Sequence, residues 1–266
     1  MKKILLFPLL AFSNLFVLGQ KTDTSIICVI GTAHENTPYE NTRILDSILN
    51  LIKPDLILEE LDSSFFTRNL QYDTLNYPSI LHGSESAPAD IASINYQRSH
   101  KVDLRPFDIT GRNKFYRDNN FFSRQNEMIQ DLYRYSNKGL LNERNQSDFN
   151  LWVKSLYNVN SISVSTLKEL NSEILMKLLE IQEGIYLDKP IEIVETTDSL
   201  KKYIEFAHLQ KDFWIKRNDT MVKNILYFSN EYKRIVVFTG NSHKYYLLNG
   251  LRQAKGPLIV KEFWEL

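Results

Sequence analysis

Residues 25–34 read SIICVIGTAH, and this stretch decides the fold class. Its continuous apolar, largely β-branched run predicts a strand buried on both faces, as in parallel sheets. Residues 43–52 then place apolar side chains at helical spacing, and residues 56–58 form a second buried strand. Strand, helix and strand in this order predict a βαβ unit, which means two parallel strands joined by a right-handed crossover.

The rest of the chain extends this pattern. Further strands are predicted at 101–109, 234–239 and 258–263, and a short helix at 244–252. Residues 63–100 are less regular, and 82–88 is typical of a surface loop. From 112 to 232 the chain is mainly helical, with breaks near 139 and at 158–163 and the clearest helices at 164–183 and 198–228. We therefore expect an α/β fold with a central mixed, largely parallel sheet flanked by helices, and a mainly helical insertion in the middle of the chain.

The N-terminus is typical of an export signal. Lys2 and Lys3 precede a mostly apolar run over 4–17, which predicts a signal peptide over 1–19 with cleavage before Gln20. The remaining residues, 20–266, are expected to form one domain in a periplasmic or secreted protein, with no membrane span in the mature chain. Basic and acidic residues balance at 32 each, so a nucleic-acid groove is not expected.

Two G-x-x-H motifs carry the predicted chemistry. One ends at His34 and the other at His243, and each directly follows a predicted strand. Ligands of open α/β sheets bind beyond the carboxyl ends of strands, so parallel neighbours would bring both imidazoles together. Glu60 lies just past the strand at 56–58. Two histidines and a carboxylate suit a divalent transition metal, so His34, Glu60 and His243 are the candidate metal ligands around a bound water. The sequence leaves open whether Glu60 is a ligand or a general base.

Several other polar residues are candidates for binding substrate. Arg217, on a predicted helix, is either a surface arginine or a cation for a substrate carboxylate or a developing oxyanion. Asn241 is a candidate substrate-binding residue, as is Asp62, which alternatively orients a histidine or caps the next segment. Arg105, Asp108 and Arg112 are best interpreted as containing a structural ion pair near the same edge, with substrate binding by one of them as the alternative.

The motif stretches 31–34, 60–62, 217–221 and 236–243 resemble the TraB family, which includes the TIKI proteases and GumN-type proteins. That family belongs to a wider group with the erythromycin-esterase-like and ChaN-like proteins. The resemblance implies a central mixed sheet and peptide hydrolysis with manganese or cobalt, with zinc or iron as alternatives. It implies catalytic roles for His34, Glu60, Arg217 and His243.

The predicted function is that of an exported metal-dependent hydrolase that cleaves peptide bonds in a peptide or protein substrate. One alternative is a haem-, iron- or other ligand-binding protein of ChaN-like type, in which Tyr245 and Tyr246 border the histidines. Another is an esterase that acts on non-peptide substrates with the same residues.

Overall fold

The computed structural model describes residues 24–69, 71–73, 75–76 and 87–266, so the predicted signal peptide and most of the loop at 82–88 lie outside the described residues. The described strands form one parallel sheet in the order β3-β2-β4-β1-β5. They are β1 (Ser25–Thr32), β2 (Leu56–Glu59), β3 (Asp103–Pro106), β4 (Arg234–Gly240) and β5 (Leu258–Val260). The α/β class is thus confirmed, and within the described chain the sheet is wholly parallel rather than mixed.

The two strands that precede the G-x-x-H motifs are direct neighbours. β1 pairs with β4, and Thr32 lies opposite Gly240 at the carboxyl end of both strands. β2 pairs with β4 and β3, so β4 separates β2 from β1. The side chains of both central strands are almost entirely buried, which explains their continuous apolar sequences. This register brings the ends of four neighbouring strands to one edge.

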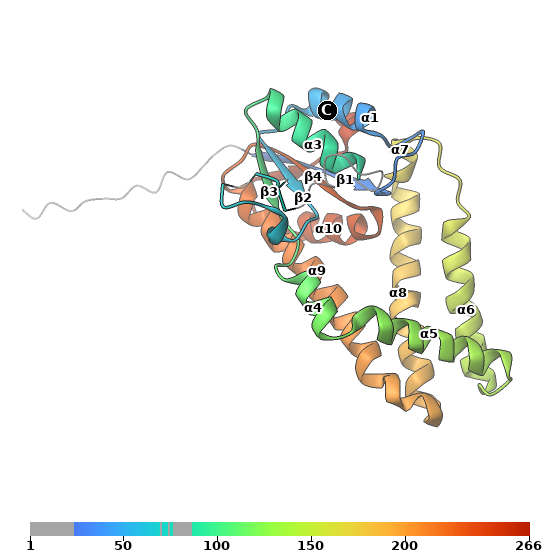
Figure 1. Ribbon diagram of the computed structural model, residues 1–266. Coiled ribbons are helices and arrows are strands. Elements are labelled where there is room, and N and C mark those ends of the chain that lie inside the picture. Colours follow the sequence, from blue (N-terminus) through green and yellow to red (C-terminus); the bar gives the residue numbers. More distant parts are fainter. Residues whose placement is uncertain (1–23, 70, 74, 77–86) are drawn as a thin grey trace, which may run out of the picture.

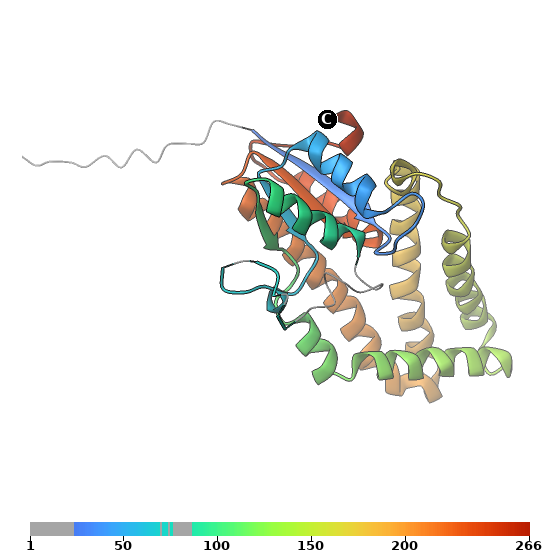
Figure 2. The same ribbon diagram turned by 45° about the horizontal axis from the view of Figure 1, so that its top comes forward.

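Helices cover both faces of the sheet (Figures 1 and 2). On one face, α1 (Thr42–Ile52) and α3 (Pro88–Ser99) pack on the strands. On the other face lie the C-terminal half of α9 (Ile204–Ser229) and α10 (Asn241–Gln253). The expectation that 63–100 is irregular was wrong for α3. Its buried side chains include the small Ala89, Ala92 and Ser93, so its apolar periodicity is weak in the sequence.

Much of the predicted helical insertion forms an extension below the sheet, while α7 (Leu167–Leu170) lies beside β1 (Figure 1). The insertion contains α4 (Arg112–Asp118), α5 (Phe121–Asn137), α6 (Glu143–Asn160), α7 and α8 (Glu173–Thr196). The helix expected over 164–183 is therefore two helices, and the second continues past Pro190. The expected helix at 198–228 is a 3-10 turn, η2 (Asp198–Tyr203), followed by α9.

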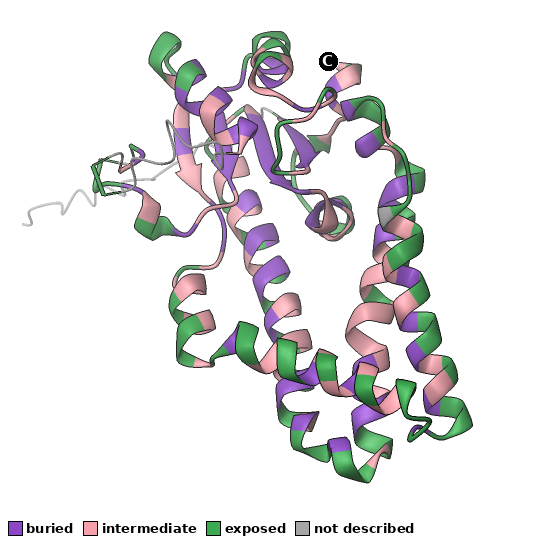
Figure 3. Cartoon of the chain, turned by 45° about the vertical axis from the view of Figure 1, so that its right-hand side comes forward, coloured by how far each residue is buried: buried purple, intermediate pink, exposed green. Residues whose placement is uncertain are grey.

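Two helices, α8 and α9, pack both in the extension and against the sheet domain's core. α8 contributes Leu175 to the core between α1 and the sheet, and Ile193 to an aromatic-rich core in the extension. α9 likewise contributes Phe206 to the extension and Met221 to the sheet. Buried residues accordingly recur along the length of both helices (Figure 3). Within the described residues, no helix has both the length and the apolar character that a membrane span requires.

At the C-terminus, β5 is shorter than the predicted strand at 258–263. The chain leaves the sheet after Val260 and forms a 3-10 turn, η3 (Phe263–Glu265). Glu262 caps this turn, and the side chain of Glu265 accepts a hydrogen bond from the Glu262 amide in return. This reciprocal pair is a capping box, and it stabilises the start of the turn.

Candidate functional site at the carboxyl edge of the sheet

Four neighbouring strands each lead to a polar side chain at the same edge of the sheet. In sheet order these are Asp108 after β3, Glu60 after β2, His243 after β4 and His34 after β1. The convergence follows from the parallel topology, because all carboxyl ends point the same way. Arg217 reaches this edge from α9, so the four predicted catalytic residues lie together.

The guanidinium of Arg217 is at the centre of the site and is buried. Its Nε and Nη2 donate to the two carboxylate oxygens of Asp108, each at 2.8 Å. Nη2 also donates to Oε1 of Glu60 at 2.5 Å, and Nη1 lies 3.1 Å from Nε2 of His243. Such fork-shaped contacts are the strongest that arginine makes with carboxylates. Arg217 therefore has a fixed orientation and a neutralised charge, and it is not a surface arginine.

This network determines the protonation of His243. Arginine can only donate hydrogen bonds, so Nε2 of His243 accepts from it. The proton is then on Nδ1, which donates to Oδ1 of Asn218 at 2.8 Å. Burial lowers the pKa of His243 to about 4, which agrees with a neutral ring. The indole of Trp214 stacks on this ring at 4.2 Å between centroids.

Both oxygens of Glu60 are engaged. Oε1 accepts from Arg217, while Oε2 accepts from the hydroxyl of Thr239 and the amide of Gly240, each at 2.7 Å. Burial raises the pKa of this carboxyl, but His243, Arg217 and His34 act more strongly in the opposite direction and lower it to about 2. Glu60 is thus a fixed anion.

His34 differs from the other members because its side chain is exposed to solvent. Its backbone has φ of 59°, a left-handed conformation that is uncommon outside glycine and concentrates at functional sites. The ring lies over Gly240, where an added Cβ would be 2.8 Å from Nε2 of His34 and 3.6 Å from Oε2 of Glu60. Glycine at 240 therefore lets the imidazole approach the carboxylate.

Two buried side chains support the histidine loops. Asn171, at the end of α7, accepts from the amide of Gly31 at 2.6 Å and donates to its carbonyl at 2.9 Å. The same amide oxygen of Asn171 accepts from Nζ of Lys244 at 2.9 Å, and Lys244 also donates to Glu262 at 2.6 Å. One side chain from the insertion thus connects both G-x-x-H motifs.

The other predicted residues have different places. Asp62 caps η1 (Ser63–Phe65) by accepting from the amide of Ser64 at 2.9 Å, which is the capping role that the sequence left open. Asn241 is the half-buried first residue of α10. Asp108 is an ion-pair partner of Arg112 as expected, at 2.6 Å, but it also belongs to the site. Its position near the end of the predicted strand at 101–109 was the available signal. For Asn218, the sequence gives no signal of a role in the site apart from its place beside Arg217.

The three candidate metal ligands do not fit a divalent ion in this arrangement. Glu60 already accepts three hydrogen bonds, and the lone pair of His243 Nε2 faces a guanidinium. A dication would also lie against Arg217 and Arg112, whose charges the carboxylates of Glu60 and Asp108 already balance. Among the described residues, no cluster of three or more histidine, cysteine or acidic side chains is arranged to hold a metal. Coordination by His34, Glu60 and His243 would require Arg217 to withdraw.

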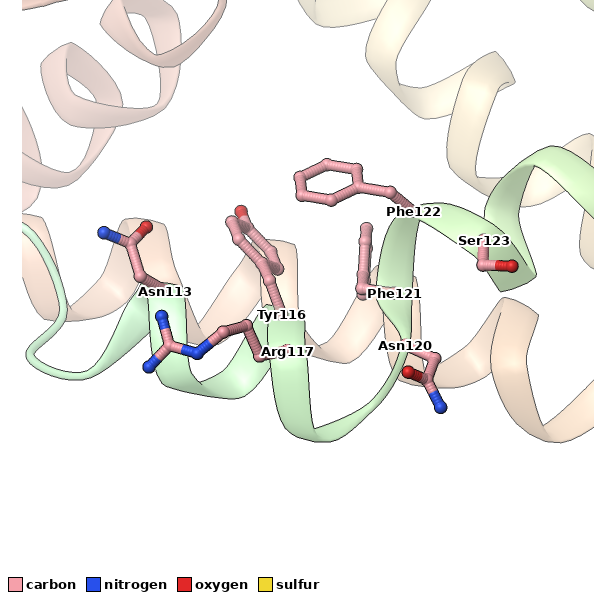
Figure 4. A pocket seen from close by; sticks show the side chains of 7 residues that line it. All are labelled: Asn113, Tyr116, Arg117, Asn120, Phe121, Phe122 and Ser123. Carbon is pink, nitrogen blue, oxygen red and sulfur yellow. The ribbon is translucent and has the colours of Figure 1, made fainter.

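A cavity of about 290 Å³ leads away from the site into the extension, and its lining includes Arg217 and Ser242. It shares Tyr116, Phe121 and Phe122 with a more open hollow of about 650 Å³. Figure 4 shows the rings of these three residues projecting to the same side of the chain, while Asn120 points the other way. The two spaces therefore adjoin at these three rings.

Comparisons of the chain with family models, curated proteins and solved structures give no significant match. The resemblance to the TraB family therefore stays a prediction, and function has to be inferred from the site itself.

Proposed function

We propose that this chain is an exported hydrolase that cleaves peptide bonds at the carboxyl edge of its sheet. The observation that carries the proposal is that the imidazole of His34 and the carboxylate of Glu60 lie on either side of the same space over Gly240. Both face the space over Gly240, and behind them lies a buried, hydrogen-bonded arginine. An exposed imidazole next to a fixed carboxylate is the arrangement that general-base catalysis requires.

We assign the proton transfer to His34. Its ring takes the proton of an attacking water, and the fixed charge of Glu60 stabilises the imidazolium that forms. Glu60 is poorly suited to be the base, because its pKa is lowered to about 2 and its oxygens already accept three hydrogen bonds. Arg217 and Asp108 hold Glu60 in place. His34 later returns the proton to the leaving amine.

The developing oxyanion needs hydrogen-bond donors. α10 begins directly after Gly240, and no side chain caps its N-terminus. Its first amides and the helix dipole therefore favour negative charge beside His34. Asn241, at the first position of this helix, is our candidate for contact with the substrate carbonyl.

Every step above uses the chain's own side chains and amides. The implied manganese or cobalt stays a prediction, and elemental analysis of the purified chain with and without added metal tests it. Near-stoichiometric metal that the His34→Ala/His243→Ala variant lacks would show that Arg217 does withdraw from Glu60. The proposed export is supported by the pattern at 1–19, and cell fractionation tests it.

The alternatives keep their own tests. Esterase activity would use the same residues, so an ester panel run beside the peptides separates the two substrate classes. Of the two motif histidines, His34 is the one that remains available for haem binding, because both ring nitrogens of His243 have partners. A Soret band on titration with haemin that His34→Ala removes would support that alternative.

The decisive experiment measures turnover of a fluorogenic peptide library by the chain from Gln20 onward. His34→Ala should lower turnover by about 10²–10⁴-fold, the usual contribution of a general base. His208→Ala is the matched control, because this exposed histidine pairs with Glu195 on α8, away from the sheet edge. Wild-type turnover in a folded His34→Ala variant would refute the proposal.

A further inference from the structure

The 290 Å³ cavity has a mainly aromatic wall. Six rings line it, contributed by the α4–α5 segment, α8 and α9: Tyr116, Phe121, Phe122, Tyr186, Phe213 and Trp214. Aromatic faces carry negative potential, so such a wall attracts cations as well as apolar groups. The remaining question is which charged side chains enter the same space.

Two charged residues line the cavity, and only one of them lacks a partner. Arg217 is neutralised by Asp108 and Glu60, as described above. Glu183, on α8, makes no hydrogen bond or ion pair within the described part of the chain. Burial raises the pKa of its carboxyl to about 7, and no neighbouring cation opposes that rise. The cavity thus combines aromatic faces with a single uncompensated carboxylate.

We propose that this cavity binds a lysine or arginine side chain of the substrate, with the aliphatic stem against the rings and the cationic head at Glu183. This specificity rests on the proposed function. The cavity reaches Arg217 and Ser242, and Ser242 directly precedes His243. An occupied cavity would therefore hold a residue that flanks the bond under attack.

The chemistry of the lining favours a basic side chain over an apolar one. A purely apolar occupant would leave the Glu183 carboxyl desolvated without a partner, which is unfavourable. An acidic occupant would add a second anion. A cation supplies the missing partner and gains the attraction of the rings, an effect that strengthens when water is excluded.

The test compares two probes that differ in charge but have similar length, Nα-acetyl-lysine amide and Nα-acetyl-norleucine amide. Binding is measured at pH 8.5 by calorimetry and by the change in tryptophan fluorescence, to which Trp214 in the cavity lining contributes. The wild-type protein should bind the lysine probe about tenfold more tightly. Glu183→Gln should remove this preference, while Glu180→Gln, three residues away and outside the cavity lining, should retain it. Equal binding of both probes by the wild-type protein, or a preference that survives Glu183→Gln, would overturn the inference.

Peptide cleavage then distinguishes this inference from the proposed function. Lysine-selective probe binding without any hydrolysis would leave the cavity assignment intact and refute the hydrolase. Hydrolysis with no preference for basic residues, together with no probe selectivity, would support the hydrolase and refute the cavity assignment. Thermal melting of each variant checks that it is folded.

Discussion

Replacing Gly240 with alanine should separate catalysis from stability. The added methyl group would lie 2.8 Å from Nε2 of His34, so the ring must retreat by about 0.6 Å to reach an ordinary contact of 3.4 Å. Misplacing a catalytic group by about 1 Å can cost on the order of 10²-fold in rate. We therefore expect turnover of the best library peptide to fall by about 10- to 100-fold.

The same change should hardly affect the fold. Gly240 has φ of −55°, which alanine adopts without strain, and the nearest atoms to the new methyl belong to side chains. Alanine gains roughly 0.4–1 kcal/mol from the restricted unfolded chain. It loses roughly 0.5–1 kcal/mol as a poorer N-cap than glycine. The free energy of unfolding in urea should thus change by less than about 1 kcal/mol.

Gly250→Ala is the matched control for this experiment. Its methyl group would lie 2.8 and 2.9 Å from the two Cγ atoms of the buried Val222, so overpacking should cost about 1–3 kcal/mol of stability without loss of turnover below the melting transition. Full turnover by Gly240→Ala would refute the placement of His34. A loss of more than about 3 kcal/mol in that variant would show that the main chain, rather than the ring, meets the methyl.

Three further outcomes are expected. Arg217→Met leaves buried carboxylates without their main cation, and with Arg112 still present we expect a loss of about 3 kcal/mol in urea unfolding; an unchanged midpoint would contradict the network. Asn171→Ala leaves the buried amide and carbonyl of Gly31 without partners, so it should lower the free energy of unfolding by about 2–4 kcal/mol and weaken turnover. Unchanged stability and unchanged turnover would show that water replaces the side chain. Glu183 has a pKa raised by burial from 4.5 to about 7, so the wild-type protein loses stability relative to Glu183→Gln as pH rises through this interval. The melting temperatures should agree below pH 4.5 and diverge in favour of the variant above pH 7; a constant difference would refute the burial of this carboxyl.

The sheet and its histidines were predictable because their signals are local. The apolar run at 25–30 and the glycines at 31 and 240 indicate where strands end, and parallel topology then brings His34 and His243 to one edge. Helix α3 was missed because alanine and serine fill much of its buried face. Its packing on α1 exists only in the folded chain.

The role of Arg217 was only partly predictable. Its partners Asp108 and Glu60 are 109 and 157 positions away, and no spacing rule connects a helix in an insertion to two strand ends. The metal hypothesis stays a prediction. Two histidines and a glutamate suggest coordination when they are considered alone, but the folded chain places a guanidinium among them.

The hydrogen bonds between Asn171 and Gly31 restrict how this protein can be re-engineered. Asn171 belongs to the insertion, yet it supports the main chain near His34. The insertion therefore cannot be removed, or transferred to another sheet, without loss of this support. Additional segments are better inserted at the far end of the extension, where the turn at 138–142 joins α5 to α6 (Figure 1). Most residues of that turn are exposed, and Gly139 has a positive φ of 64°. A linker, an affinity tag or a small reporter domain inserted there would leave the carboxyl edge of the sheet untouched.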